Sequence, residues 1–256
     1  MRSRLSAFVN RLLAAIGYAI VRIDDKRLVE AKTFAGVDFA YDNLYLLDTY
    51  APWITDEDFR TVWEVASRNS LTNTFRSYEL YQCVREVARI PGDILEVGVW
   101  RGGTAAVLSA AAAKWKPTAK VWLCDTFSGV VKAGVYDASY SGGEHADTTQ
   151  TVVADLLSSL KLTNASIVRG VFPDESAAAL LDAKIALCHI DVDVYQSAAD
   201  IVGWLRPRLS SGSMIVFDDY GFSTCKGITR YVNELRMGGE WIYLYNLNKH
   251  AVLIKR

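Results

Sequence analysis

Apolar runs and helical patterns alternate along the chain from about residue 90 onwards. Short apolar runs bounded by turn residues predict strands at 94–98, 121–125, 165–169, 184–190 and 214–217. Helical spacing fills the intervals, at 104–114, about 151–160, 176–181 and 197–209. This alternation predicts an α/β fold with a doubly wound, mostly parallel, Rossmann-like sheet. No helix separates the last two runs, 241–245 and 251–254, which follow a helix near 227–236, so we expect an antiparallel C-terminal edge.

The first part of the chain follows another pattern. Apolar residues at helical spacing between Leu5 and Ile16 predict an amphipathic helix, too short to span a bilayer and without a signal-peptide cleavage site. We expect this helix to pack on its own domain or on a second copy in a homo-oligomer. Peripheral membrane contact through residues 1–20 is the less favoured alternative. An aromatic stretch at 34–53 predicts a lid, and helical patterns follow, so we assign 1–75 to an N-terminal helical or lid extension and 76–256 to the main domain.

Composition narrows the class of protein. The chain has 256 residues, of which 51% are hydrophobic and 22% charged, as in soluble globular proteins. A net charge of −1 gives no electrostatic footprint for nucleic acid. The four cysteines form no CxxC pair, which disfavours a zinc site and predicts reduced thiols in a cytoplasmic protein.

Two acidic clusters directly follow two of the predicted strands. Asp191 and Asp193 come after the run 184–190, and Asp218 and Asp219 come after 214–217. Ligands of open α/β sheets bind at the carboxyl ends of the strands. Neighbouring carboxylates repel one another unless a cation lies between them, and a hard divalent ion such as Mg²⁺ suits oxygen ligands. The alternative is that these acids are separate helix caps and turn residues.

A glycine loop joins the first predicted strand to its helix. Its order is G-x-x-x-G, from Gly98 to Gly102, and it lacks the extra glycine with which dinucleotide-binding loops approach a pyrophosphate. Glu96 at the strand tip would repel a pyrophosphate but suits a cationic, hydroxyl-rich ligand such as S-adenosylmethionine. Asp125 ends the next strand and could accept both ribose hydroxyls of either NAD or S-adenosylmethionine.

Four segments of the chain resemble the macrocin O-methyltransferase (TylF) family and occur in that family's order. They are 92–103, with Trp100-Arg101-Gly102-Gly103; 121–129; 189–197, with Asp191-Val192-Asp193-Val194-Tyr195; and 217–221. The resemblance covers roughly residues 70–235. It implies a class I methyltransferase that depends on S-adenosylmethionine and Mg²⁺ and methylates a hydroxyl of a sugar or other natural product, a small-molecule or glycan acceptor. The implied metal ligands are Asp191, Asp218 and Asp219. The implied cofactor contacts are Glu96, Gly98, Val99, Trp100, Gly102, Asp125, Thr126, Ser128, Gly170, Val171, Phe172 and Asp191.

The chain departs from related metal-dependent methyltransferases at the position where some of them have a basic side chain that could act as general base. Some of these have lysine or histidine three residues after the first metal aspartate, where this chain has Val194. Asp191 is therefore the candidate catalytic residue, unless the metal alone acidifies the hydroxyl. His145 lies in the polar loop 128–149, and we expect it to be a solvated loop residue. We expect His189 to be a hydrogen-bonded core histidine.

Three alternatives stay open at this point. A nicotinamide-dependent oxidoreductase would use the same Asp125, although the loop lacks the pyrophosphate glycine. A phenolic acceptor could replace the sugar. A partner-binding protein with a decayed methyltransferase fold would not need the complete set of carboxylates.

Overall fold

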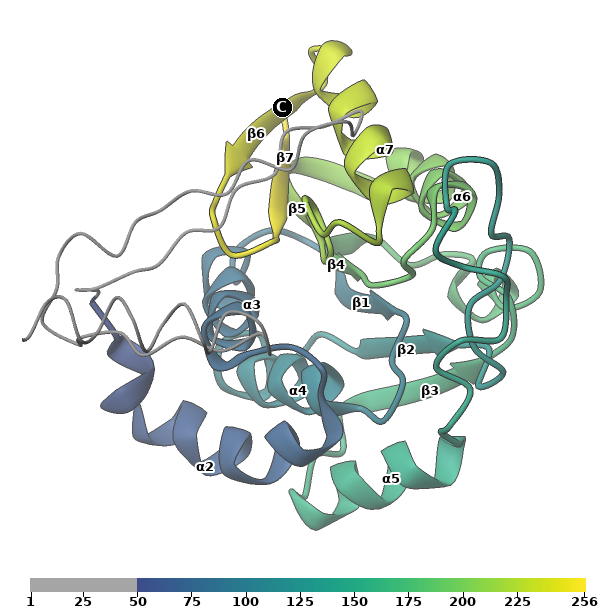
Figure 1. Cartoon of the computed structure of the whole chain (residues 1–256). Helices are drawn as coiled ribbons and strands as arrows, with labels where there is room; N and C mark the ends of the chain where they lie inside the picture. Colours follow the sequence, from purple (N-terminus) through teal and green to yellow (C-terminus); the bar gives the residue numbers. More distant parts are fainter. Residues whose placement is uncertain (1–49) are drawn as a thin grey trace, which may run out of the picture. The chain divides into compact units, whose positions relative to one another are not determined.

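The computed structural model describes residues 50–256, which contain one seven-stranded sheet. The strand order is β3-β2-β1-β4-β5-β7-β6 (Figure 1). The first five strands run parallel, and β7 is antiparallel to both β5 and β6. This confirms the mostly parallel, doubly wound sheet with an antiparallel C-terminal edge. The strands are β1 (Asp93–Val97), β2 (Val121–Asp125), β3 (Ala165–Arg169), β4 (Ile185–Ile190), β5 (Leu209–Phe217), β6 (Trp241–Tyr245) and β7 (Ala251–Lys255).

Helices cover the two faces of the sheet and close a hydrophobic core on each (Figure 1). One core takes Phe59, Leu80, Leu108 and Val153 from four helices: α2 (Glu57–Ala66), α3 (Thr74–Glu86), α4 (Gly103–Trp115) and α5 (Gln150–Ser159). The other is built on α6 (Tyr195–Leu205) and α7 (Lys226–Met237). The short 3-10 turns are η1 (Pro52–Ile54), η2 (Ser67–Asn69), η3 (Ala177–Leu180) and η4 (Arg206–Arg208).

Side-chain caps fix where three of the helices begin. The carboxylate of Asp56 accepts a hydrogen bond from the Phe59 amide at 3.1 Å, and Asn73 accepts one from Arg76 at 3.0 Å. Thr149 caps α5 through the Val152 amide at 3.3 Å. Such caps satisfy amides that have no partner within the helix. Because Asn73 is a cap, α3 begins at Thr74.

The largest difference from the predicted elements lies before the tip of β5. We expected a helix to 209 and a turn at 211–213, whereas α6 ends at Leu205 and β5 begins at Leu209. Gly212, with φ of +86°, and Ser213 form an irregularity within the strand, where the Ser213 hydroxyl bonds to the Ile185 carbonyl at 3.0 Å. Turn residues are tolerated inside a strand at a bulge. The predicted helix 176–181 is the 3-10 turn η3.

The compact unit that contains the sheet begins at Ala51 and so includes α2, which we had expected in an N-terminal extension. The predicted amphipathic helix and most of the aromatic segment lie outside the described residues. Between residues 50 and 256, no helix has the length and apolar character needed to cross a membrane. The four cysteines are free and buried.

Candidate active site at the carboxyl edge of the sheet

A cavity of about 380 Å³ opens at the carboxyl ends of the parallel strands. The chain order reverses there: β2 and β3 lie on one side of β1, and β4 and β5 lie on the other. This switch point is where open α/β sheets bind ligands, and the volume is within the range of small-molecule sites. Its walls come from the glycine loop, the loop 126–149, the segment after β3, the acids after β4 and β5, and the region 71–76.

The glycine loop lies directly against the first acidic cluster. Gly98 has φ of +90°, and a Cβ added there would lie 1.7 Å from the carbonyl oxygen of Asp191. Only glycine combines this backbone conformation with so close an approach. Gly102, with φ of +88°, precedes α4 as its N-cap. The cofactor-binding loop predicted from sequence is therefore in contact with the backbone of the predicted metal site.

Asp125 shapes this loop. One carboxylate oxygen accepts hydrogen bonds from the amides of Val99 and Trp100, at 2.7 and 2.9 Å. The other accepts from Phe127 at 2.6 Å. Asp125 also lines the cavity beside Gly98 and Trp100. Each carboxylate oxygen can accept more than one bond, so the side chain can hold the loop and still face a ligand.

Asp191, Asp218 and Asp219 converge at the cavity. One oxygen atom from each lies within 4.8 Å of the others. Burial raises the pKa of Asp191 and of Asp219 well above the usual range, and the neighbouring carboxylates raise both further. Burial also opposes ionisation of Asp218, but the close contact with His250 and the charge of Arg76 outweigh it, so the pKa of Asp218 is lowered.

The donor set fits a hard divalent cation. Of the three acids, Asp218 alone has ion-pair partners among residues 50–256, namely Arg76 and His250. Ionisation of all three carboxylates would therefore create more negative charge than these ion pairs compensate, and oxygen-only ligands suit Mg²⁺. Asp193, with φ of +63°, lies beside them and accepts a bond from the Tyr140 hydroxyl at 2.7 Å.

Seven of the predicted cofactor contacts line the cavity: Gly98, Trp100, Asp125, Thr126, Gly170, Phe172 and Asp191. Five do not: Glu96, Val99, Gly102, Ser128 and Val171. Glu96 is fully buried and contacts the Nδ1 atom of His189 at 2.9 Å. This carboxylate therefore pairs within the core and does not line the cavity, and its contact with the cofactor stays a prediction. His189 is the buried, hydrogen-bonded core histidine that we expected.

Sequence reasoning missed Arg76, which lines the cavity and pairs with Asp218. Helical spacing could have indicated that Arg76 is buried. It lies four residues before Leu80 and eight before Val84, which are both buried on the core face of α3. A charged residue on such a face is unusual unless it is paired. His145 is exposed, as expected of a solvated loop residue, and it also lines the cavity. The other unforeseen wall residues include Tyr140, in the long polar loop, and Phe222, Thr224 and Cys225, just after the second acidic cluster.

Comparisons with known proteins agree with this fold and site. The chain is 29% identical over 159 residues to a tetracenomycin-C derivative 4'-O-methyltransferase of Streptomyces olivaceus, covering 57% of this chain and 60% of that protein. It is 28% identical over 188 residues to mycinamicin III 3''-O-methyltransferase of Micromonospora griseorubida, covering 66% and 70%. A third relative, demethyldecarbamoylnovobiocin O-methyltransferase of Streptomyces niveus, is 27% identical over 60% and 63% of the two chains. The match thus spans less than two thirds of two of these relatives.

Solved structures share the fold. The O-methyltransferase NovP superposes with a TM-score of 0.63 at 22% identity, covering 73% of this chain and 82% of that one. The calicheamicin methyltransferase CalS11 superposes with a TM-score of 0.61 at 19% identity, covering 81% and 94%. The profile of the macrocin-O-methyltransferase family matches residues 57–240, which include the glycine loop and both acidic clusters. The chain belongs to the macrocin-O-methyltransferase (TylF) family.

Proposed function

We propose that this protein is an S-adenosylmethionine- and Mg²⁺-dependent O-methyltransferase that acts on a hydroxyl of a sugar or other natural product. The observation that carries the proposal is the contact between the glycine loop at Gly98 and the carboxylate site at Asp191. A methyl donor on the loop and a hydroxyl at the acids would lie side by side. The names of two relatives support a sugar acceptor, since one is a methyltransferase for a dimethoxyrhamnosyl compound and another methylates mycinamicin III.

The cofactor would lie along the walls built by β1, β2 and β3. Gly98 and Trp100 would contact the methionine end, and Asp125 would accept the ribose hydroxyls while holding the loop. Gly170 and Phe172 would border the adenine. Phe172 packs edge-on against Trp204 at 4.8 Å between ring centroids, which fixes its ring.

Asp191, Asp218 and Asp219 would hold Mg²⁺. When bound, the ion would lower the pKa of the acceptor hydroxyl and orient it. The protein's own side chains then position the acceptor and receive its proton. Asp191 is the candidate acceptor of that proton, because Val194 is fully buried and has no basic group. Tyr140, in the loop 126–149, restrains the adjacent Asp193 and forms part of the cavity wall.

Cofactor and metal can be tested separately. Calorimetry should show binding of S-adenosylhomocysteine in the presence of EDTA, because the proposed cofactor contacts and metal ligands are mostly different residues. NAD should not bind. Methyl transfer to a panel of deoxysugar glycosides and phenols should stop in EDTA and return with Mg²⁺. Binding of NAD in place of S-adenosylhomocysteine would indicate an oxidoreductase, and turnover in EDTA would remove the metal from the proposal.

Variants of the two neighbouring acids test the role of Asp191. Asp191→Asn should lower kcat more than Asp193→Asn, since Asp191 both ligates the metal and accepts the proton. Loss of a general base costs about 10²–10⁴-fold in rate. An Asp191→Asn enzyme with unchanged turnover would return this acid to a structural role.

A further inference from the structure

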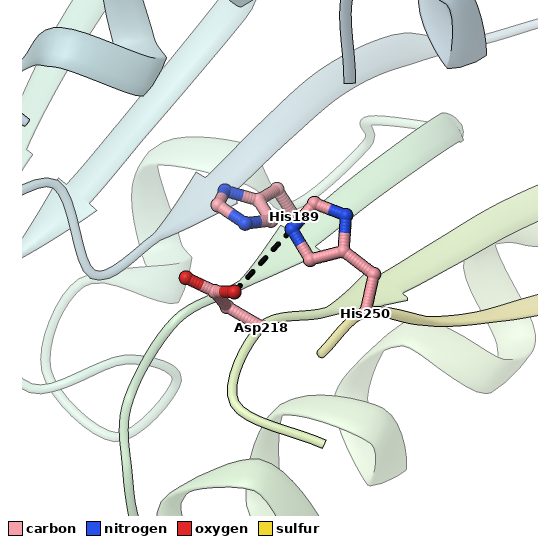
Figure 2. A group of neighbouring side chains, drawn as sticks. All are labelled: His189, Asp218 and His250. Atoms are coloured by element: carbon pink, nitrogen blue, oxygen red, sulfur yellow. Dashed lines mark ion pairs between the residues drawn. The ribbon is translucent and has the colours of Figure 1, made fainter. Parts of the chain in front are cut away.

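The antiparallel pairing of β5 and β7 brings a histidine to one of the three carboxylates. In this register Phe217 is opposite Ala251, so the next pair outward is Asp218 and His250. Residues opposite one another in an antiparallel pair point to the same face. The Nε2 atom of His250 lies 3.3 Å from the Oδ1 atom of Asp218 (Figure 2). The contact is a close polar approach and not a well-aligned hydrogen bond.

A second carboxylate holds the other side of the imidazole. The Nδ1 atom of His250 lies 2.5 Å from an oxygen of Glu79, on α3. Glu79 also accepts bonds from the side-chain amides of Asn246 and Asn248, at 2.6 and 2.9 Å, in the loop that joins β6 to β7. A neutral imidazole carries one N–H and would turn a lone pair towards one of the two carboxylates, whereas an imidazolium donates to both. In either protonation state, Glu79 holds the Nδ1 side of the ring and the Nε2 atom faces Asp218.

Helix α3 supports Asp218 in two ways. Arg76 forms an ion pair with the same Oδ1 atom directly, and Glu79 acts through His250. The two residues are three positions apart and so lie on the same face of the helix. His250 is fully buried and Asp218 is 4% exposed, so water does not compete for these contacts. Arg76 and His250 thus contact the same carboxylate oxygen of Asp218.

We propose that His250, oriented by Glu79, is a positioning residue that fixes the carboxylate of Asp218 for the divalent cation. This inference rests on the metal site of the proposed function. Mg²⁺ requires near-ideal octahedral geometry, so a ligand that rotates freely binds it poorly. Groups that orient metal ligands from behind contribute about 10–100-fold to metal affinity.

The same residues allow one competing arrangement. Donor atoms of His189, Asp218 and His250 lie within 4.8 Å of one another, and the Nε2 atom of His189 is buried without a hydrogen-bond partner. Two histidines and a carboxylate could bind a metal themselves. The guanidinium of Arg76 disfavours this, because it occupies the Asp218 oxygen that faces His250 and would repel a second cation there.

Titration calorimetry of the full-length protein with Mg²⁺ distinguishes these arrangements. His250→Gln and Glu79→Gln should each weaken Mg²⁺ binding about 10–100-fold. The His250→Ala protein should bind Mg²⁺ more weakly than His250→Gln, because glutamine keeps a hydrogen-bond donor. The affinity for S-adenosylhomocysteine should be unchanged, and turnover should recover at high Mg²⁺. Asp93→Asn is the control. Asp93 accepts bonds from the Trp122 indole and the Lys120 amide at the opposite end of the sheet, so this variant perturbs a partly exposed network without altering Mg²⁺ affinity.

Three results would overturn the proposal. Unchanged Mg²⁺ affinity in a folded His250→Gln or Glu79→Gln protein would show that the pair does not position Asp218. Two equivalents of metal in the wild type, with one lost in the His250 variants, would make His250 a ligand itself. A wild-type protein that binds S-adenosylhomocysteine but no Mg²⁺ would instead refute the metal part of the proposed function, and the inference with it.

Discussion

Replacing Asp125 with asparagine tests how the glycine loop is held. The carboxylate accepts three backbone hydrogen bonds, two on one oxygen and one on the other. An asparagine side chain has a single acceptor oxygen. In its better orientation that oxygen keeps the bonds from Val99 and Trp100, and its NH₂ group faces the amide of Phe127, which loses its partner.

The cost follows from that one lost acceptor. Leaving a buried donor without a partner costs about 1–3 kcal/mol, and because Asp125 is only half-buried we expect about 1–2 kcal/mol. With 1.4 kcal/mol per factor of ten, this corresponds to about 5- to 30-fold. If the loop is already formed without ligand, the loss reduces the free energy of unfolding. If the ligand orders the loop, the loss reduces the affinity for S-adenosylhomocysteine.

Urea unfolding with and without S-adenosylhomocysteine measures both contributions together. Asp147→Asn is the matched control, since Asp147 contacts the same loop through the Trp100 indole at 2.9 Å and Arg101 at 2.8 Å but is 62% exposed. Surface pairs contribute about 0–1 kcal/mol, so the control should change little. An Asp125→Asn protein with wild-type stability and wild-type affinity would show that these bonds do not hold the loop.

Three further results are expected. Gly98→Ala should abolish folding or cofactor binding, because its Cβ would overlap the Asp191 carbonyl. Gly203→Ala, in α6 with open space around it, should stabilise the protein by about 0.5–1 kcal/mol in thermal melts. Equal melting temperatures for the two variants would contradict this. Burial raises the thiol pKa of Cys83, Cys124 and Cys188, that of Cys124 to about 12. Ellman's reagent should therefore label these thiols only after unfolding, and rapid labelling of the native protein would contradict this expectation. Deleting residues 1–20 should leave S-adenosylhomocysteine affinity unchanged, and sedimentation and liposome binding would show whether the segment supports a dimer or a membrane contact.

The sequence predicts the features of this fold that depend on local pattern and on topology. Apolar runs and helical spacing place the strands within a few residues, because burial in a doubly wound sheet requires those periods. The convergence of Asp191, Asp218 and Asp219 follows from their positions after adjacent strands. The position of Asp125 follows in the same way, from the end of the strand next to the glycine loop.

Long-range side-chain contacts account for what the sequence does not predict. Arg76 and Asp218 are 142 residues apart, and Glu79 and His250 are 171 apart, so nothing local links them. Glu96 shows a related difficulty. Glu96 is paired with His189 in the β1–β4 register. Its side chain therefore contacts the His189 ring within the sheet's core and not the glycine loop. A shift of one residue along a strand changes the face on which a side chain lies.

The contact between Gly98 and Asp191 has a consequence for how such a scaffold can change its substrate. Two backbone segments in van der Waals contact leave no room for an insertion or a larger side chain, so the spacing between donor site and acid site is fixed by the main chain. Variation in what the cavity accepts must arise elsewhere on its wall. Leu71, Phe222 and the part of the loop 126–149 that excludes Thr126 and Tyr140 are free to differ, and directed libraries aimed at new acceptors should be confined to them.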